Sequence, residues 1–316
     1  MPAILTHDFF GRDVLHALSG GEALSQSERD AFLLGNQGPD PLFYLMVDPL
    51  RQDKAKLGNR MHGERTNDLL LMLKRSLSAL DARDVPIGRA YAQGFLCHYL
   101  LDSRMHPLVY AQEYAICDAG VEGLDRSDGS AVHAVIESEF DEMVLYNRYR
   151  LTIADYSPAQ QVLHADEDVL RIIGLMYAFL LSQVYGVKED GGLYPGAVYD
   201  FRLAQTVLYS PAGVKRELLA RVEQVVYGHR YSVVRGMSHR PRETKSTWFA
   251  NPDHHTWTNP WTDASDSRSF ADIYEAELEE AARAIALFEK LDFSADDVRA
   301  ITGDVNFSGK PLPQEA

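Results

Sequence analysis

Apolar residues recur at intervals of three and four along most of this 316-residue chain. That spacing places them on one face of an α-helix, whereas the strands of a half-buried sheet show strict alternation. The sequence shows no sustained alternation with hairpin dipeptides, so a large sheet is not expected. We therefore predict an all-α protein, a multi-helix bundle. The segments with helical spacing are 7–18, 59–80, 87–106, 129–150, 167–186, 212–229 and 267–291.

Three segments rich in proline, glycine or polar residues interrupt these helices, at 35–41, 187–200 and 237–267. None of them divides the chain into two hydrophobic cores, which predicts a single helical domain over residues 1–316. The third segment is long and carries all three tryptophans, so we expect a loop insertion there. It is either a lid or substrate-facing wall or, as the alternative, a packed surface loop anchored by its indoles.

The charge balance limits the partners of the chain. It carries 46 Asp and Glu against 31 Lys and Arg, a net charge of -15, which disfavours generic binding to nucleic acid or to an anionic membrane surface. The longest apolar run, 172–182, is shorter than the roughly 20 residues of a membrane span, so we predict a buried core helix and no integral membrane association. The first residues show no signal-peptide pattern and there are only two cysteines, which predicts a cytoplasmic protein.

Two helical segments carry polar residues at the spacing of metal ligands. His98, Asp102 and His106 follow one another at four-residue intervals, which places them on one side of a helix. His133 and Glu137 repeat the four-residue interval in the next long helical segment. Such pairs hold metal ions in helical metalloenzymes, but a single pair is also common as an ordinary core or surface contact. Two pairs on consecutive helices favour a metal site.

Pro107 follows directly after this first set, and we expect the helix to end there. Further candidates lie upstream. His7 is at the edge of the first helical segment, Asp40 stands between two prolines, and His62 is expected to begin a helix. Taken singly, His7 also fits a capping or core histidine, Asp40 fits ordinary turn chemistry, and His62 fits a solvated surface histidine.

The order of these residues resembles the zinc-dependent phospholipase C family of bacteria, which is all-helical and related to the single-strand-specific trinuclear zinc nucleases. The ordered set is His7, Asp40, His62, His98, Asp102, His106, His133 and Glu137. The resemblance implies a first zinc held by Asp40, His62, His98 and Asp102, a second held by His106, His133 and Glu137, and a third held by His7 with Asp102 as a bridge. The cofactor implied is thus two or three zinc ions.

The resemblance also implies an activity. Zinc ions would neutralise the phosphate charge and activate a water molecule for phosphodiester hydrolysis, with Asp40 as both ligand and general base. Asp141 and Glu64 are candidates for orienting the histidines, or else plain solvated acids. The expected substrate is a small phosphorylated molecule or a phospholipid head group; the oligomeric state is left open. Two alternatives stand beside this enzyme: a non-catalytic helical metal-binding or scaffold protein, and a nuclease or phosphatase acting on a soluble phosphate ester.

Overall fold

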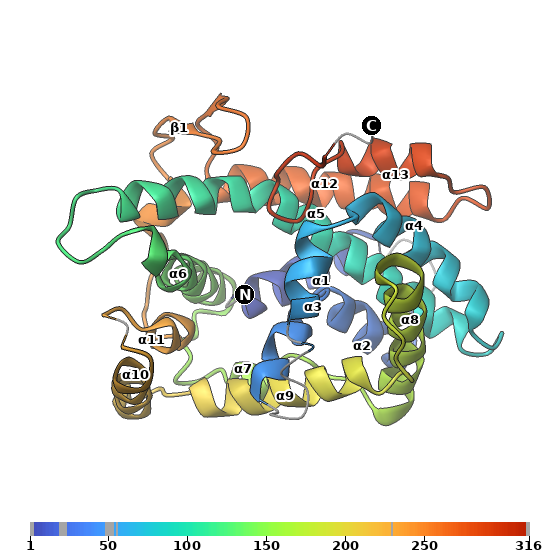
Figure 1. Ribbon diagram of the computed structural model, residues 1–316, viewed down its shortest axis with the longest axis horizontal. Helices are drawn as coiled ribbons and strands as arrows, with labels where there is room; N and C mark the ends of the chain where they lie inside the picture. The colour runs from blue at the N-terminus through green and yellow to red at the C-terminus, as the bar shows by residue number, and fades with distance from the viewer. Residues whose placement is uncertain (1–2, 19–23, 48–53, 55, 229, 314–316) are drawn as a thin grey trace. The chain divides into compact units, whose positions relative to one another are not determined.

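The structure is a computed structural model and describes residues 3–18, 24–47, 54, 56–228 and 230–313. It confirms the all-α prediction: apart from one two-stranded antiparallel hairpin and an isolated bridge, the regular secondary structure of the described residues is helical (Figure 1). The α-helices are α1 (Ile4–Leu18), α2 (Gln26–Gly35), α3 (Lys56–Gly63), α4 (Thr66–Ser76), α5 (Val85–Cys117), α6 (Gly129–Tyr149), α7 (Pro158–Gln161), α8 (Glu167–Tyr185), α9 (Leu193–Leu208), α10 (Val214–Tyr227), α11 (Val233–Met237), α12 (Phe270–Phe288) and α13 (Ala295–Thr302). Shorter elements are the 3-10 turns η1 (Asp40–Val47), η3 (Leu77–Ala79), η4 (Arg126–Asp128) and η5 (Trp248–Ala250), and the strands β1 (Trp257–Thr258) and β2 (Ser265–Asp266).

The chain contacts divide into two compact units. The first comprises Met1–Thr6, Met105–Gln161 and Gln205–Ile273, and the second comprises His7–Arg104, Val162–Ala204 and Tyr274–Ala316. The prediction of a single domain stays a prediction, because two contact clusters can still belong to one cooperative folding unit.

In the second unit, α8 supplies a large part of the core. Its residues Ile172, Ile173, Leu180 and Leu181 are at most 1% exposed, and α4 and α2 both pack against this helix. Among the described residues, α8 is also the one helix long and apolar enough to cross a membrane, and 61% of its apolar window is buried inside the structure. Such burial fits the core helix predicted over 172–182.

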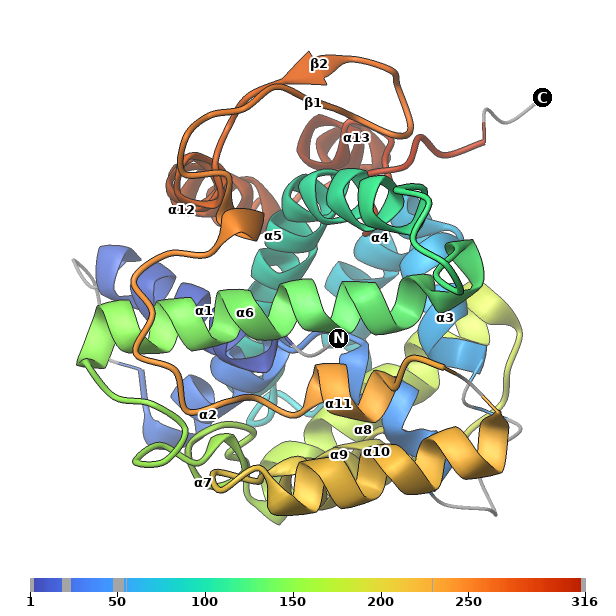
Figure 2. The same ribbon diagram turned by 90° about the vertical axis from the view of Figure 1, so that its left-hand side faces the viewer.

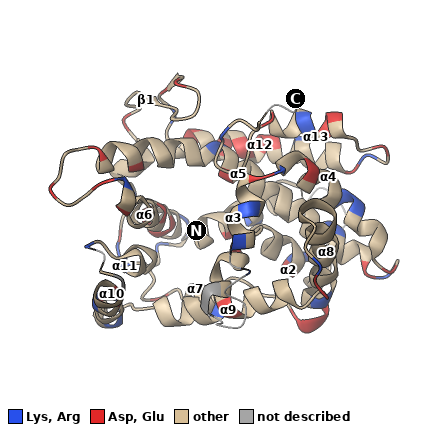
Figure 3. Ribbon diagram, viewed as in Figure 1, with Lys and Arg blue, Asp and Glu red and all other residues tan. Residues whose placement is uncertain are grey.

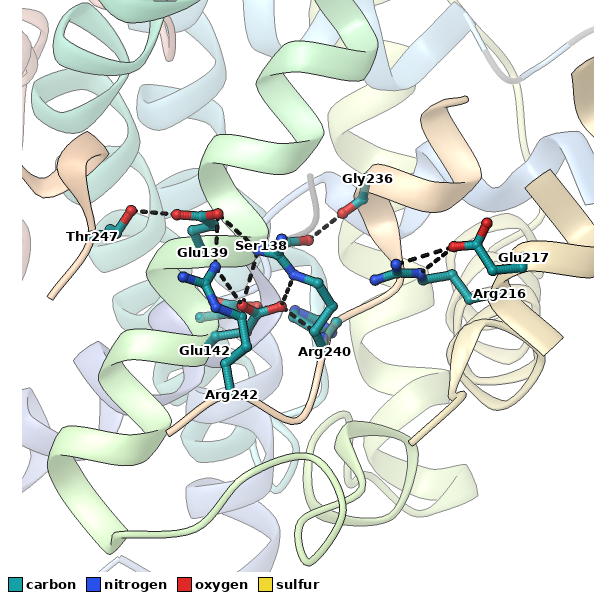
Figure 4. Close-up of polar contacts among 11 residues, drawn as sticks. Ser138, Glu139, Glu142, Arg216, Glu217, Gly236, Arg240, Arg242 and Thr247 are labelled. Carbon is teal, nitrogen blue, oxygen red and sulfur yellow. Dashed lines mark hydrogen bonds and ion pairs between the residues drawn. The ribbon is translucent and has the colours of Figure 1, made fainter. Parts of the chain in front are cut away.

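In the first unit, α6 packs against α11, and α11 packs against α10 (Figures 1 and 2). The approach of α11 to α6 depends on Gly236, because a Cβ at that position would lie 2.9 Å from the Cβ of Ala134. The Ser138 hydroxyl of α6 donates to the Gly236 carbonyl (Figure 4). From α11 the chain continues as the predicted long loop, which includes η5 and the β1–β2 hairpin.

Charged side chains attach the start of this loop to α6. Arg240 and Arg242 both pair with Glu139 and Glu142, and the Thr247 hydroxyl donates to Glu139 (Figure 4). Glu142 is only 1% exposed at its side chain, so the two guanidinium groups supply the charge that its burial requires. The loop insertion is thus held to the helical body over its first ten residues.

The predicted helix end at Pro107 is wrong. The helix α5 runs through Pro107 to Cys117. Proline inside a helix costs about 3 kcal/mol, because one backbone hydrogen bond is lost and the ring crowds the preceding turn. Leu108 and Val109, which follow directly, are each only 1% exposed. Burial of such side chains contributes about 1.5–3 kcal/mol each, enough to offset the proline.

Two other segments differ from the sequence prediction. The segment 59–80 is split by Arg65, whose φ of 56° ends the helical path, so His62 lies in the last turn of α3 and does not begin a helix. The expected connection 187–200 is helical from Leu193, because Pro195 stands in the first turn of α9, where its missing N–H costs nothing.

Candidate metal centre

The turn that carries Asp40 is held against α5 by a close approach of two helices. A Cβ on Gly35 of α2 would lie 2.3 Å from the Tyr91 carbonyl oxygen, and one on Gly94 of α5 would lie 2.0 Å from the Phe32 carbonyl oxygen. Only glycine permits this backbone contact at either position. It brings the turn that follows α2, and with it Asp40, to the level of His98 on α5.

Gly38 then fits the turn around His98. Its φ is +50°, and a Cβ there would lie 2.2 Å from Cδ2 of the His98 ring. On its other side, the Gly38 carbonyl oxygen faces the hydroxyls of Tyr91, Tyr177 and Tyr194 at 3.4, 3.1 and 3.1 Å. Burial raises the pKa of each of these tyrosines well above its usual range, so the hydroxyls remain protonated donors.

The first group of candidate ligands is Asp40, His62 and His98, all buried, whose ligand atoms lie within 4.8 Å of one another. Nδ1 of His62 is 2.8 Å from the Gly58 carbonyl oxygen, and Nε2 is 2.9 Å from Oδ1 of Asp40. Nδ1 of His98 is 3.1 Å from the Asn36 carbonyl oxygen. Because a carbonyl only accepts, each Nδ1 carries the proton, and in the neutral ring Nε2 carries the lone pair.

The second group is His7, His98 and Asp102. Nε2 of His7 lies 3.1 Å from one oxygen of Asp102, and Nε2 of His98 lies 3.3 Å from the other. Asp102 thus stands between two imidazoles with a different oxygen toward each. His98 belongs to both groups, and its Nε2 also lies 3.9 Å from Oδ1 of Asp40.

The donor set of these two groups fits a cation. Nε2 of His98 is fully buried and has no hydrogen-bond partner among the described residues, although carboxylate oxygens lie beside it. A lone pair facing a carboxylate in a buried site is repulsive unless a proton or a metal ion lies between them. Imidazole nitrogens and carboxylate oxygens without thiolate are what a catalytic zinc site uses. The neighbouring Cys97 stays a thiol, because burial raises its pKa far above the usual range.

A third group lies in the first unit and consists of His106, His133 and Glu137. Oε1 of Glu137 lies 3.4 Å from Nε2 of His106 and 3.3 Å from Nε2 of His133. The other ring nitrogen of His133, Nδ1, is 2.9 Å from Oε2 of Glu113, a buried carboxylate on α5. This arrangement of carboxylate, histidine and ligand site is the one that fixes the ring orientation in zinc sites.

The ionisation of these groups follows from their contacts. Burial raises the pKa of Asp40, but the neighbouring imidazoles of His98 and His62 outweigh it and hold that pKa below its usual value. For Glu137 burial is likewise outweighed, by the charge of the N-terminal amino group and by the contacts with His133 and His106, and its pKa lies well below the usual range. Burial lowers the pKa of His133, whereas the Glu137 and Glu113 carboxylates raise it above its usual value. Both acids are thus carboxylates at neutral pH.

The eight residues singled out in the sequence therefore converge in three buried groups. The two further acids behave differently. Asp141 is fully buried, but it accepts from the backbone N–H groups of Leu5 and Thr6 and lies 2.8 Å from Nε2 of His239. It caps the start of α1 and orients none of the eight. Glu64 is an exposed acid paired with Arg60, so the plain solvated reading is correct.

A family model described as zinc dependent phospholipase C matches residues 6–180, more than half of the chain and the whole stretch that holds the eight residues. The chain belongs to the zinc-dependent phospholipase C family. That family is an enzyme family that depends on zinc, and the buried groups of this member can hold metal ions. Neither curated proteins nor solved structures gave a significant match.

This family member also places residues from beyond the matched region around the candidate ligands. Phe307 is fully buried, and its ring lies 5.0 Å from the His62 ring and 5.8 Å from the His98 ring. Its backbone N–H donates to the His62 carbonyl. These contacts hold the segment after α13 beside the histidines, and the buried Phe307 ring excludes water from them.

The tryptophan-containing loop of this phospholipase C family member contacts the third group through an intermediate ring. Trp261 packs edge-on against Tyr110 at 5.2 Å, and Tyr110 lies 5.0 Å from the His133 ring. The indole of Trp257 donates to the Arg268 carbonyl within the loop, whereas Trp248 is 70% exposed. Two of the three indoles are thus anchors, as the alternative reading of the loop supposed.

Proposed function

We propose that this chain is a metal-dependent hydrolase of phosphoric esters that acts by phospholipase C-like phosphodiester hydrolysis. The observation that carries the proposal is the orientation of His62 and His98. Each donates Nδ1–H to a backbone carbonyl and turns its Nε2 lone pair toward buried carboxylates. A cation between them removes the repulsion, and the family model supports zinc as that cation.

The proposed ligands follow the three groups. Asp40, His62, His98 and Asp102 would hold one ion, His7 with the second oxygen of Asp102 another, and His106, His133 and Glu137 a further one. Bound zinc would offset the charge of a phosphodiester and activate a water molecule for attack. Asp40, ionised by its neighbours, is the proposed proton acceptor as well as a ligand. A cytoplasmic location and a small phosphorylated substrate or phospholipid head group belong to the same proposal.

Metal analysis combined with turnover tests the proposal. The purified protein should contain at least two metal ions per chain and hydrolyse a chromogenic soluble phosphodiester, and chelation should abolish hydrolysis until zinc is restored. Asp40→Asn should lower both the metal content and kcat/KM, the latter by about a hundredfold or more. Asp84→Asn is the matched control, because Asp84 is a buried carboxylate outside the groups that pairs with Arg171.

Two outcomes would count against the proposal. Full metal content without hydrolysis of any phosphodiester or phosphomonoester would favour the non-catalytic metal-binding protein. Hydrolysis that resists chelation, or that survives Asp40→Asn at the level of Asp84→Asn, would exclude the metal groups as the catalytic site.

A further inference from the structure

The helix α10 presents apolar side chains to solvent along most of its length. Val214, Leu218, Val222, Val225 and Val226 are 75, 61, 53, 84 and 65% exposed. The first four follow one another at intervals of four, four and three residues, so they lie on one face of the helix. A contiguous apolar face of this kind on a protein surface marks a binding site more often than scattered apolar residues do.

Among the described helices, α9 carries a shorter exposed apolar row, whereas α12 carries none; the residues of α9 are Tyr199, Leu203 and Val207, at 48, 52 and 42% exposure. The exposed residues of α12 include Asp272, Glu275, Glu279 and Arg283, whereas its apolar residues Ile273 and Phe288 are fully buried. That is the ordinary arrangement of an amphipathic surface helix. The apolar face of α10 is longer and more exposed than the row on α9.

The charged residues of α10 are sorted by sign. The exposed ones are Lys215 and Arg221, both cations, whereas Glu217 and Glu223 are only partly exposed (basic residues are blue in Figure 3). Glu217 pairs with Arg216 and Arg235 (Figure 4 shows the first pair). Glu223 accepts from the Ser232 hydroxyl and from the Val234 N–H at the start of α11. The acids are thus bound to arginines or to α11, and the solvent-facing side is apolar and cationic.

We propose that this face of α10 docks the protein on an anionic phospholipid surface. A helix with an apolar face bordered by Lys and Arg lies in the interface between lipid head groups and acyl chains, where anionic lipids attract the cations. The new element is α10 as the contact face, and the inference rests on the proposed function only in that the docked surface would present the substrate of that hydrolase.

A second copy of the chain fits this face less well. In a symmetric dimer the same patch meets itself, so Lys215 and Arg221 would face other cations at the edge of the apolar contact. An anionic lipid surface instead supplies the opposite charge next to an apolar layer. Charge complementarity therefore favours the lipid.

Sedimentation with lipid vesicles tests the docking face on the full chain. The protein should sediment with vesicles that contain phosphatidylglycerol and remain in solution with phosphatidylcholine alone. The double variant Leu218→Gln/Val225→Gln should partition at least tenfold more weakly. The matched control is Val121→Gln/Leu291→Gln, which makes the same changes at two other exposed apolar residues and should partition as the wild type does.

The cations are tested in the same assay. Lys215→Gln/Arg221→Gln should weaken partitioning by about fivefold per cation and remove most of its dependence on salt. The inference is overturned if the wild type does not partition, or if Leu218→Gln/Val225→Gln partitions as the control does. It is also overturned if sedimentation velocity shows a dimer that this variant dissociates while no vesicle binding occurs.

Hydrolysis of a soluble phosphodiester, measured on the same preparations, separates the two proposals. Vesicle binding without hydrolysis would remove the proposed function and leave the docking face in place. Hydrolysis of the soluble diester without vesicle binding would remove the docking face alone. The α10 variants should retain the wild-type rate on the soluble substrate, because none of these residues belongs to the candidate ligands.

Discussion

Gly38 is the position where one added carbon atom should most disturb the candidate metal centre. In Gly38→Ala the new Cβ would lie 2.2 Å from the His98 ring. That ring has no exposed surface and is held by its hydrogen bond to Asn36, so it has no room to move aside. The left-handed backbone costs about 1–2 kcal/mol for alanine, and overpacking of this kind adds about 1–3 kcal/mol. We expect a loss of about 2–5 kcal/mol in the free energy of unfolding.

A second glycine separates these two contributions. Gly303, after α13, has a similar φ of +57°, but nothing lies within 4 Å of the position of its Cβ. Gly303→Ala should therefore show the backbone cost alone, about 1–2 kcal/mol. Urea unfolding of both variants gives the difference, provided that the slope with denaturant is unchanged.

The contact with His98 should also be visible in metal binding. Gly38→Ala should weaken zinc affinity about tenfold or more, because it displaces the ring of a ligand histidine. Loss of the hydrogen bond that supports a ligand histidine has an effect of this size. Competition with a chromogenic chelator measures this, and Gly303→Ala should match the wild type. If Gly38→Ala costs no more stability than Gly303→Ala and leaves zinc affinity unchanged, the packing of the turn against His98 is not what positions the ring.

Two further predictions concern the first unit. Glu113→Gln removes the carboxylate beside Nδ1 of His133 and should lower metal affinity by about 10- to 100-fold while the fold is retained; equal metal retention in equilibrium dialysis would contradict the orienting role. Burial raises the pKa of Glu139, but the Thr247 hydroxyl and the two arginines lower it below its usual value. Its contribution to stability is therefore present above the unfolded-state pKa, about 4.3, and is lost as the pH falls through the lower folded-state value. Glu139→Gln should be less stable than the wild type near neutral pH, with the difference shrinking in acid, whereas Glu279→Gln, a change at an exposed acid, should show no such trend; thermal unfolding across pH measures both.

Periodicity in the sequence was sufficient to predict most of the long helices and the ligand pairs that lie on one helix, whereas the helices α2, α9 and α13 were not predicted. Four-residue spacing is a property of the helix itself, so His98 with Asp102 and His133 with Glu137 had to share a face wherever the helices packed. The helical period likewise survives tertiary packing, as α6 and α8 show. These features are local, and local geometry is what a sequence specifies best.

The supporting contacts could not be predicted in the same way. The rings of His62 and His98 are oriented by the carbonyl groups of Gly58 and Asn36, and every residue type has a carbonyl. Phe307 reaches the histidines across more than 200 residues of sequence, which no spacing reveals. Glu113 had a detectable signal, since it stands seven residues after His106 on the same helix, but only once α5 is known to continue through Pro107. The expectation that a helix ends at proline concealed this signal.

The net charge of the chain and its local charges lead to different conclusions about an anionic partner. A charge of -15 opposes an anionic surface at long range, but at physiological ionic strength it is screened beyond about 8 Å. At contact, the exposed Lys215 and Arg221 of α10 determine the sign of the interaction, and the five exposed apolar side chains add attraction that salt does not weaken. The same reasoning applies to the buried groups: Asp40 and Asp102 repel a phosphate, and only cations held between them and the histidines reverse that sign. An acidic protein can therefore act on an anionic lipid if its local charge is positive at two places, the docking face and the metal centre.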